Sequence, residues 1–146
     1  MTATHRNLLW LPLARFERDA VRSALQRSGL RSDDVDVDAP GRWFWRFEED
    51  DVPVGFGGIE VAGDAGLLRL VTLPLVRHRG LGGAMAEALE GEAVALGCKD
   101  LYVAPSGEDA FFGDLGYAPC PPDALPPAVA ARFPGAAAAV MTKRVG

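Results

Sequence analysis

The sequence predicts an α/β protein in which a single-layer mixed sheet of about six to seven strands is flanked by three to four helices. Strand-like apolar segments alternate along the chain with segments of helical spacing, and Gly or Pro residues bound most of them. No internal repeat or linker separates these segments, and 146 residues is a usual length for one domain. We therefore expect a single domain over residues 1–146.

The first half of the chain predicts four strands and one helix. The strands are expected at residues 8–14, with an end near Pro12, and at 43–48, 54–61 and 67–73. Apolar residues recur at helical spacing from Arg18 to Ser28, and Gly29 is placed to end that helix. Polar turns at 49–51 and 63–64 join the later strands. This order predicts an antiparallel meander with one helix inserted early.

The second half of the chain predicts helices and strands in alternation. They are expected as a helix at 81–96, a strand at 98–104, a short helix at 106–115, one or two helical turns at 129–133 and a strand at 140–145. Gly97 and Gly116 stand where the first two of these helices should end. Ser106 and Asp109 have the spacing of a capping box. Five prolines between residues 119 and 127 predict an irregular segment.

Composition and charge exclude several classes of protein. The chain is 49% hydrophobic and 24% charged, as ordinary globular proteins are, and its formal net charge of −5 argues against a nucleic-acid partner. The apolar run from Leu8 to Ala14 is too short to span a membrane. It also lacks the succession of charged start, apolar stretch and small-residue cleavage site that marks a signal peptide. Cys98 and Cys120 make neither a disulfide framework nor a zinc site by themselves. We expect a cytoplasmic protein without a metal or a membrane partner.

The segment from Arg77 to Ala84 carries the clearest chemical signal. It follows a strand that ends at Pro74 and contains Gly80, Gly82 and Gly83 at the start of the next helix. The first N–H groups of a helix lack partners and carry partial positive charge, so they bind phosphate, and glycines let the backbone approach closely. The segment predicts a diphosphate-binding turn. The alternative is an ordinary glycine-rich connection.

Two other phosphate loops do not fit this segment. A dinucleotide-binding fingerprint needs a glycine three residues after Gly82, where Met85 stands, and a P-loop needs Gly-Lys followed by Ser or Thr, which the chain lacks. The spacing Arg-x-x-Gly-x-Gly, from Arg77 to Gly82, instead resembles the pyrophosphate-binding motif of the GNAT superfamily of acyl-CoA N-acyltransferases. The resemblance implies the GNAT fold and acetyl-CoA as the acetyl donor.

The resemblance covers nearly all of the chain from Val54 to Val145. Leu67-Leu68-Arg69, the run from Ala110 to Tyr117 and the tail from Ala128 to Arg144 are similar to arsenic-resistance (ArsN-type) N-acetyltransferases and to the acetyltransferase domains of bacterial N-acetylglutamate synthases. This similarity implies transfer of acetyl to the amine of a small molecule, an amino acid or an analogue of one. The chain departs from this group at 105–107 and 133–135, which lie on the expected acceptor side. The resemblance therefore carries over more directly to the residues that bind the acetyl donor than to those that bind the acceptor.

The resemblance also implies which residues contact the two substrates. The acetyl-CoA contacts are Leu70, Val71, Thr72, Leu73, Arg77, His78, Arg79, Gly80, Leu81, Gly82, Gly83, Ala84, Phe111 and Phe112, and the acceptor contacts are Arg69 and Ser106. At 70–72 the backbone amides are expected to meet the pantetheine arm and the oxyanion, while the side chains are core. Phe112 stands where many members carry a tyrosine that acts as the general acid. Because phenylalanine has no hydroxyl, it can only form a wall beside the thioester.

Three catalytic questions stay open at this stage. Glu60, near the end of a strand, is either the base that deprotonates the acceptor amine or a solvated carboxylate. Arg69 either meets a carboxylate of the acceptor or makes a structural ion pair. The general acid is Tyr102, another residue, water or no group at all, since Tyr117 is expected in the core. At least one ring of Trp43–Trp45 is expected to line the acceptor site or a homodimer contact.

Two functions remain after these arguments. The first is an acetyl-CoA-dependent N-acetyltransferase that acts on a small primary amine. The second is a sensor or regulatory module that binds CoA without turnover, which the missing tyrosine at Phe112 favours somewhat.

Overall fold

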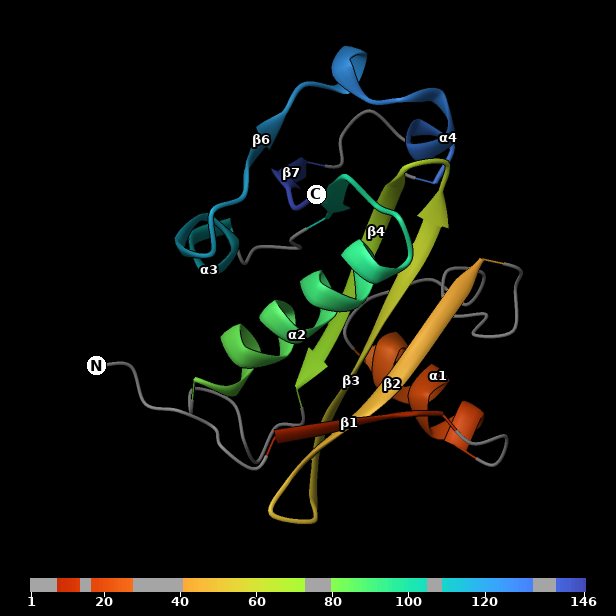
Figure 1. Ribbon diagram of the computed structural model, residues 1–146, viewed down its shortest axis with the longest axis vertical. Helices are drawn as coiled ribbons and strands as arrows, with labels where there is room; N and C mark the ends of the chain where they lie inside the picture. The colour runs from red at the N-terminus through yellow and green to blue at the C-terminus, as the bar shows by residue number, and fades with distance from the viewer. Residues whose placement is uncertain (1–7, 14–16, 28–40, 73–79, 105–108, 133–138) are drawn as a thin grey trace. The chain divides into compact units, whose positions relative to one another are not determined.

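The computed structural model of the chain has seven strands, four α-helices and one 3₁₀ helix among its described residues (Figure 1). The described residues are 8–13, 17–27, 41–72, 80–104, 109–132 and 139–146. The strands follow the hydrogen-bonded order β1-β2-β3-β4-β5-β7-β6, with β4 and β5 parallel and the β1–β2, β5–β7 and β6–β7 pairs antiparallel. The predicted fold class, a mixed sheet of six to seven strands with three to four helices, is confirmed.

The chain divides into two compact units, Met1–Gly58 with Arg69–Leu89 and Ile59–Leu68 with Glu90–Gly146. The elements are β1 (Leu8–Pro12), α1 (Arg18–Arg27), β2 (Arg42–Glu49), β3 (Val52–Ala62), β4 (Ala65–Thr72), α2 (Leu81–Ala95), β5 (Asp100–Val103), α3 (Asp109–Asp114), β6 (Ala118–Cys120), the 3₁₀ helix η4 (Pro122–Ala124), α4 (Pro127–Ala130) and β7 (Val140–Arg144). The chain passes from one unit to the other within β3, β4 and α2.

In the first unit, β1 and β2 pair from Leu8 opposite Glu49 to Pro12 opposite Trp45. Strand β2 turns directly into β3 through Asp50 and Asp51, whose φ angles are 53° and 66°. Positive φ at both central residues matches the twist of an antiparallel hairpin, and short Asp side chains tolerate it better than most. The predicted polar turn at 49–51 is therefore a tight hairpin.

Helix α2 begins and ends where the glycines predict. It starts directly after Gly80, whose φ is 77°, and Gly97, with φ of 91°, follows its last turn. The side chains of Leu81, Met85, Leu89 and Ala93 are 0–1% exposed, and they recur every four residues along one side of the helix. A Cβ at Gly57 of β3 would stand 2.5 Å from Cδ1 of Leu89, so this helix packs on the strand only because Gly57 has no side chain.

In the second unit, β7 is the strand that joins β5 to the edge of the sheet. Its residues Met141–Arg144 pair with β5, and Val140–Thr142 pair with β6 on its other side. We predicted an irregular segment around Pro119, and this is wrong for Ala118–Cys120, which forms β6 opposite Thr142–Val140. A proline is tolerated there because β6 is an edge strand, where a missing N–H leaves no ladder bond unmade.

The core of the second unit includes α4. Val129 is completely buried and packs with Ala65, Tyr102 and Val140, so one short helix contacts residues of β4, β5 and β7. The helix starts at Pro127, two residues before the predicted start, because proline suits the first helical position. Cys98 is 2% exposed, as a small apolar residue would be.

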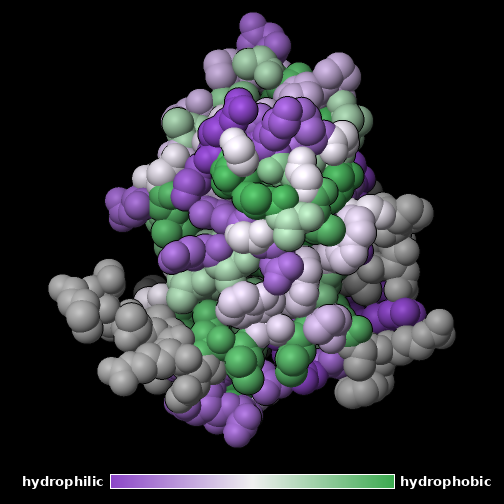
Figure 2. All heavy atoms as spheres, viewed as in Figure 1, coloured by the Kyte–Doolittle hydropathy of each residue, from purple (hydrophilic) through white to green (hydrophobic). Residues whose placement is uncertain are grey.

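Large apolar side chains are exposed on the first three strands, in the first unit. Leu9, Trp10, Leu11, Trp43 and Val52 are 37–56% exposed, and Figure 2 shows apolar surface over β1. Phe44 and Trp45, by contrast, are buried at 8% exposure. Of the three aromatic candidates, Trp43 is the one whose side chain is exposed. No helix among the described residues is long and apolar enough to cross a membrane.

Candidate functional site

The first turn of α2 presents backbone rather than charged side chains. Gly80 is exposed, Gly82, Gly83 and Ala84 are half-buried, and Leu81 anchors the turn at 1% exposure. The turn contains no acidic residue. Its N–H groups and the positive end of the helix dipole are therefore presented without a competing carboxylate, and the residues present fit a diphosphate.

The sequence-predicted contacts around this turn are only partly described. Leu73, Arg77, His78 and Arg79 lie outside the described residues. Strand β4 continues to Thr72, while its pairing with β5 covers Ala65 to Leu67. The predicted pantetheine contacts at 70–72 are thus extended backbone beyond that paired segment, the conformation in which an amide can bind an extended ligand.

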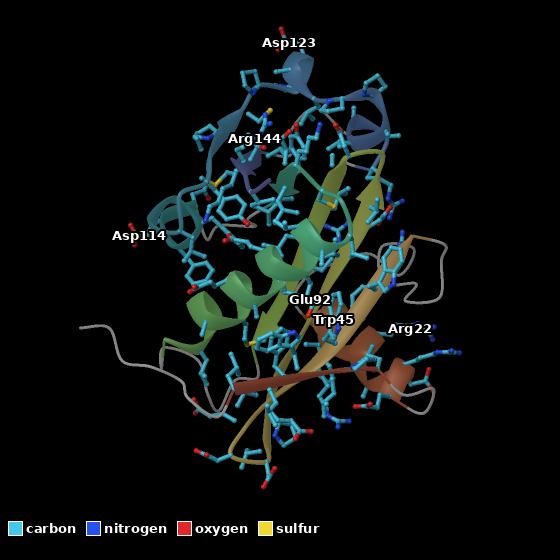
Figure 3. All side chains as sticks on the ribbon, in the orientation of Figure 1. Arg22, Trp45, Glu92, Asp114, Asp123 and Arg144 are labelled. Atoms are coloured by element: carbon cyan, nitrogen blue, oxygen red, sulfur yellow. The ribbon has the colours of Figure 1, made fainter. Side chains whose placement is uncertain are left out.

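The predicted aromatic contacts lie on α3 in the second unit. The ring of Phe112 meets Phe111 edge-to-face with centroids 5.0 Å apart, and it meets Tyr117 at 5.5 Å. Phe112 is 5% exposed, so it is chiefly a packing residue of this unit. At the outer end of the helix, Asp114 points away from the protein (Figure 3).

Glu60 lies on β3 and forms an ion pair with Arg132. The Nε atom of Arg132 is 2.7 Å from Oε2 of Glu60, and the two side chains are 27% and 14% exposed. Arg132 is held by α4, since its backbone N–H donates to the carbonyl of Val129 over 2.9 Å. Both side chains are partly exposed, but the Nε atom of Arg132 that meets Glu60 is itself buried in the second unit.

Sequence reasoning did not single out Arg132. One signal was available, because Arg132 is the only charged residue between Asp123 and Lys143. Arginine in such an apolar segment needs an acidic partner or water, and the structure supplies Glu60. The pairing itself depends on tertiary structure, since the two residues are far apart in the chain.

The other acceptor-side and acid candidates differ in their surroundings. Arg69 is buried in the first unit at 7% exposure, and Ser106 lies outside the described residues. Tyr117 is in the core, as predicted, and donates its phenol hydrogen to Oε2 of Glu90 over 2.9 Å. Burial is the main cause that raises the pKa of both Tyr117 and Tyr102 above the ordinary value. Neither phenol is suited to give up a proton at neutral pH.

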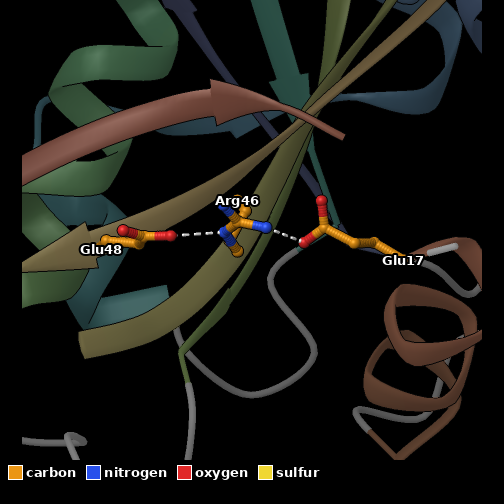
Figure 4. Close-up of polar contacts among 3 residues, drawn as sticks. All are labelled: Glu17, Arg46 and Glu48. Carbon is orange, nitrogen blue, oxygen red and sulfur yellow. Dashed lines mark hydrogen bonds and ion pairs between the residues drawn. The ribbon is translucent and has the colours of Figure 1, made fainter. Parts of the chain in front are cut away.

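A second charged cluster lies in the first unit and was not foreseen. Arg46 of β2 donates from Nε to Oε2 of Glu48 over 2.6 Å and from a terminal nitrogen to Glu17 (Figure 4). Hydrogen bonding to Glu17 is the main cause that raises the pKa of Arg46. Glu17 precedes α1 and is 8% exposed, so the arginine ties the start of that helix to β2.

Comparison with solved structures supports the fold. An N-acetylglutamate synthase from Neisseria gonorrhoeae, solved with coenzyme A and N-acetyl-glutamate, matches at a TM-score of 0.73 and 16% identity over 95% of this chain and 35% of that one. A putative acyl-CoA N-acyltransferase from Klebsiella pneumoniae matches at 0.76 and 20% identity over 98% and 100%. The ribosomal-protein-S18-alanine N-acetyltransferase from Escherichia coli matches at 0.68 and 15% identity over 95% and 94%.

The chain spans about a third of the length of the gonococcal synthase, since it covers 35% of that protein. No sequence among the curated proteins matches the chain. The model of the acetyltransferase (GNAT) family matches residues 6–117, which include β1 to α3 and the turn at the start of α2. The chain is therefore a member of the acetyltransferase (GNAT) family.

Proposed function

We propose that the protein transfers the acetyl group of acetyl-CoA to the primary amine of a small molecule, an amino acid or an analogue of one. The observation that carries the proposal is the start of α2, where a glycine-rich turn without acidic residues opens a helix inside the family match. The similar fold of a synthase solved with coenzyme A and N-acetyl-glutamate supports an amino-acid acceptor.

In this proposal the acetyl donor binds chiefly at the end of β4 and at the start of α2. The first turn of α2, with Arg77, His78 and Arg79 before it, binds the diphosphate. The backbone of β4 at 70–72 orients the pantetheine arm, and its N–H groups stabilise the oxyanion that forms when the amine attacks. Leu73 and the rings of Phe111 and Phe112 are the remaining proposed donor contacts.

Glu60 is the proposed general base. An amine reaches the site mostly as the ammonium, so its proton passes to the Glu60 carboxylate before or as the nitrogen attacks the thioester carbonyl. The C–N bond forms, the C–S bond breaks, and CoA leaves as a thiolate. That thiolate takes the second proton of the amine nitrogen through water, and Glu60 returns its own proton to solvent. No buried phenol is needed as an acid.

The acceptor side contains two more proposed contacts, Arg69 and Ser106. Arg69 is buried at 7% exposure, so an acceptor would meet it only at the inner end of its site. The alternative function, a CoA-binding sensor, is favoured by Phe112, because this ring replaces the tyrosine expected from the resemblance.

A thiol-release assay separates the two functions. The full chain is mixed with acetyl-CoA and, one at a time, with L-amino acids, alkylamines, spermidine and a peptide with an N-terminal alanine, and free CoA is followed over many turnovers. Acceptor-dependent release, with the acetylated amine detected by mass spectrometry, supports the enzyme. Tight acetyl-CoA binding in calorimetry without release for any acceptor would replace it with the sensor.

A further inference from the structure

Strand β1 exposes apolar side chains along most of its length. It stands at one end of the strand order and, among the described strands, pairs with β2 (Figure 1). Leu9, Trp10 and Leu11 are 53%, 37% and 40% exposed. Single exposed apolar side chains are common, but three in succession on an edge strand mark a surface on which another molecule packs.

Leu9 and Leu11 lie on the same face of the sheet, because they are two residues apart in a strand. Their backbone is fixed. The N–H group of Leu13 donates to the carbonyl of Phe44 over 3.2 Å, and in an antiparallel ladder this orientation recurs at every second residue. The backbone groups of both leucines therefore point toward β2, and their side chains stand on a rigid strand.

The charged residues beside these leucines already have partners of opposite charge. Glu48 lies opposite Leu9 in the register of the two strands, and residues directly opposite share a face. Arg46 lies opposite Leu11 in the same way. Arg46 bonds to both Glu48 and Glu17 (Figure 4), so covering this face leaves no charge of the cluster without a partner.

The pattern along β1 is complementary to itself. When two β1 strands meet antiparallel around a two-fold axis, Leu9 of each copy stands against Leu11 of the other. Glu48, the acidic neighbour of one leucine, then comes to the side of Arg46, the basic neighbour of the other. A parallel arrangement would bring like charges to the same side. The surface is thus apolar at its centre and complementary in charge at its margin.

The other end of the strand order offers no equivalent surface. Strand β6 has three residues, and Pro119 stands in its middle. A short edge strand that contains proline is a usual protection against pairing between molecules. In β1 the proline is the last residue, Pro12, so residues 8–11 carry neither proline nor charge.

We propose that two copies of the protein associate through β1, as an antiparallel two-fold dimer in which Leu9 of each copy packs on Leu11 of the other. The contact is made by one short strand from each copy, so the dimer forms reversibly and dissociates on dilution. Neither leucine is among the residues proposed to bind acetyl-CoA or the acceptor. The inference therefore stands or falls separately from the proposed function.

The test measures the mass of the full chain by sedimentation over a wide range of concentration. We expect a monomer at low concentration and a dimer at high concentration. Leu9→Glu should raise the dissociation constant of the dimer about 10-fold or more, because a carboxylate is then placed against Leu11 without a partner. Val94→Glu makes the same change at a 46% exposed position of α2, in the second unit, and should leave the dimer unchanged.

A second pair of variants tests the antiparallel arrangement. Leu9→Glu combined with Leu11→Lys sets a carboxylate against an ammonium on both sides of the axis, so it should restore association. Leu9→Glu combined with Leu11→Glu should not. All these side chains are exposed, so the fold is retained, and circular dichroism checks it.

Three results would overturn the proposal. The first is a wild type that stays monomeric at every concentration or grows into assemblies larger than two copies. The second is a dimer that Leu9→Glu weakens no more than Val94→Glu does. The third is a failure of the Leu11→Lys change to restore association, which rules out the pairing of Leu9 with Leu11.

Discussion

The phenol of Tyr117 donates a hydrogen bond to Oε2 of Glu90 over 2.9 Å. The other oxygen of this carboxylate accepts from Nζ of Lys143 at 3.0 Å, and the same ammonium donates to the carbonyl of Leu115 at 2.8 Å. The ammonium also lies 5.6 Å from the centre of the Tyr117 ring. One carboxylate in the second half of α2 thus ties the segment after α3 to β7 within the second unit.

The first prediction concerns this cluster. Tyr117→Phe removes the hydroxyl group but keeps the aromatic ring. Glu90 then loses its hydrogen bond from Tyr117 and keeps its contact with Lys143. We expect a loss of about 1.5–3 kcal/mol in the free energy of unfolding, the usual range for a hydrogen bond to a charged group. Denaturant unfolding at neutral pH measures it. Thiol release should be unchanged, and a large loss of kcat would instead mean that the Tyr117 phenol takes part in the reaction.

The same phenol predicts a dependence on alkaline pH. Burial raises the pKa of Tyr117 above the ordinary value of about 10, so the unfolded chain loses this proton at a lower pH than the folded one. Above about pH 10 the unfolded state therefore binds fewer protons, and the free energy of unfolding falls as pH rises. We expect this fall to be shallower in Tyr117→Phe, measured by urea unfolding between pH 9 and 11. If the free energy of unfolding falls equally steeply with pH in the wild type and in Tyr117→Phe, this prediction is wrong.

The third prediction concerns the first turn of α2. Gly82→Asp adds a side chain and a negative charge where the diphosphate is proposed to bind. We expect the affinity for CoA to fall about 10-fold or more, because repulsion is added and the backbone can no longer approach closely. Isothermal titration calorimetry measures it. Gly91→Asp makes the same change at an exposed position of the same helix, with open space around it, and should leave affinity unaltered.

The fourth prediction concerns Glu60. Glu60→Gln keeps the shape of the side chain but cannot accept the proton of the acceptor ammonium. The rate of acetyl transfer should fall about 10²- to 10⁴-fold, while the dissociation constant of acetyl-CoA hardly changes. Single-turnover kinetics and calorimetry give the two numbers. Asp123→Asn, which removes an acidic group that points away from η4 (Figure 3), serves as the control. Wild-type rates in Glu60→Gln would assign Glu60 a structural role only.

The fifth prediction concerns the packing of α2 on β3. A Cβ at Gly57 would stand 2.5 Å from Leu89 Cδ1, 3.1 Å from the Phe47 ring and 3.3 Å from the backbone oxygen of Arg69. Because these neighbours are buried or fixed, we expect Gly57→Ala to lower the free energy of unfolding by about 1–3 kcal/mol. Gly113→Ala in α3, with nothing within 4 Å, should be neutral or stabilising. Thermal unfolding of both variants tests the contrast.

Local patterns in the sequence determined most of the elements. Helix α2 could be located from the apolar residues that recur from Leu81 to Ala93 and from Gly80 and Gly97, because helical period and positive φ are properties of a few neighbouring residues. Strand β1 ends at Pro12 for the same kind of reason. The Arg-x-x-Gly-x-Gly spacing indicated the family, since a phosphate-binding turn is built from contiguous backbone.

Only the tertiary structure decided what depends on distant partners. Strand β6 contains Pro119 and has a weak local signal, so it is defined by its pairing with β7. Glu60 could be chosen as a candidate from its strand, but its partner Arg132 could not, because a short helix anchored by Val129 brings the two together. Ion pairs between separate elements leave no periodic trace in a sequence, since their spacing is set by the packing of the core and not by the local backbone.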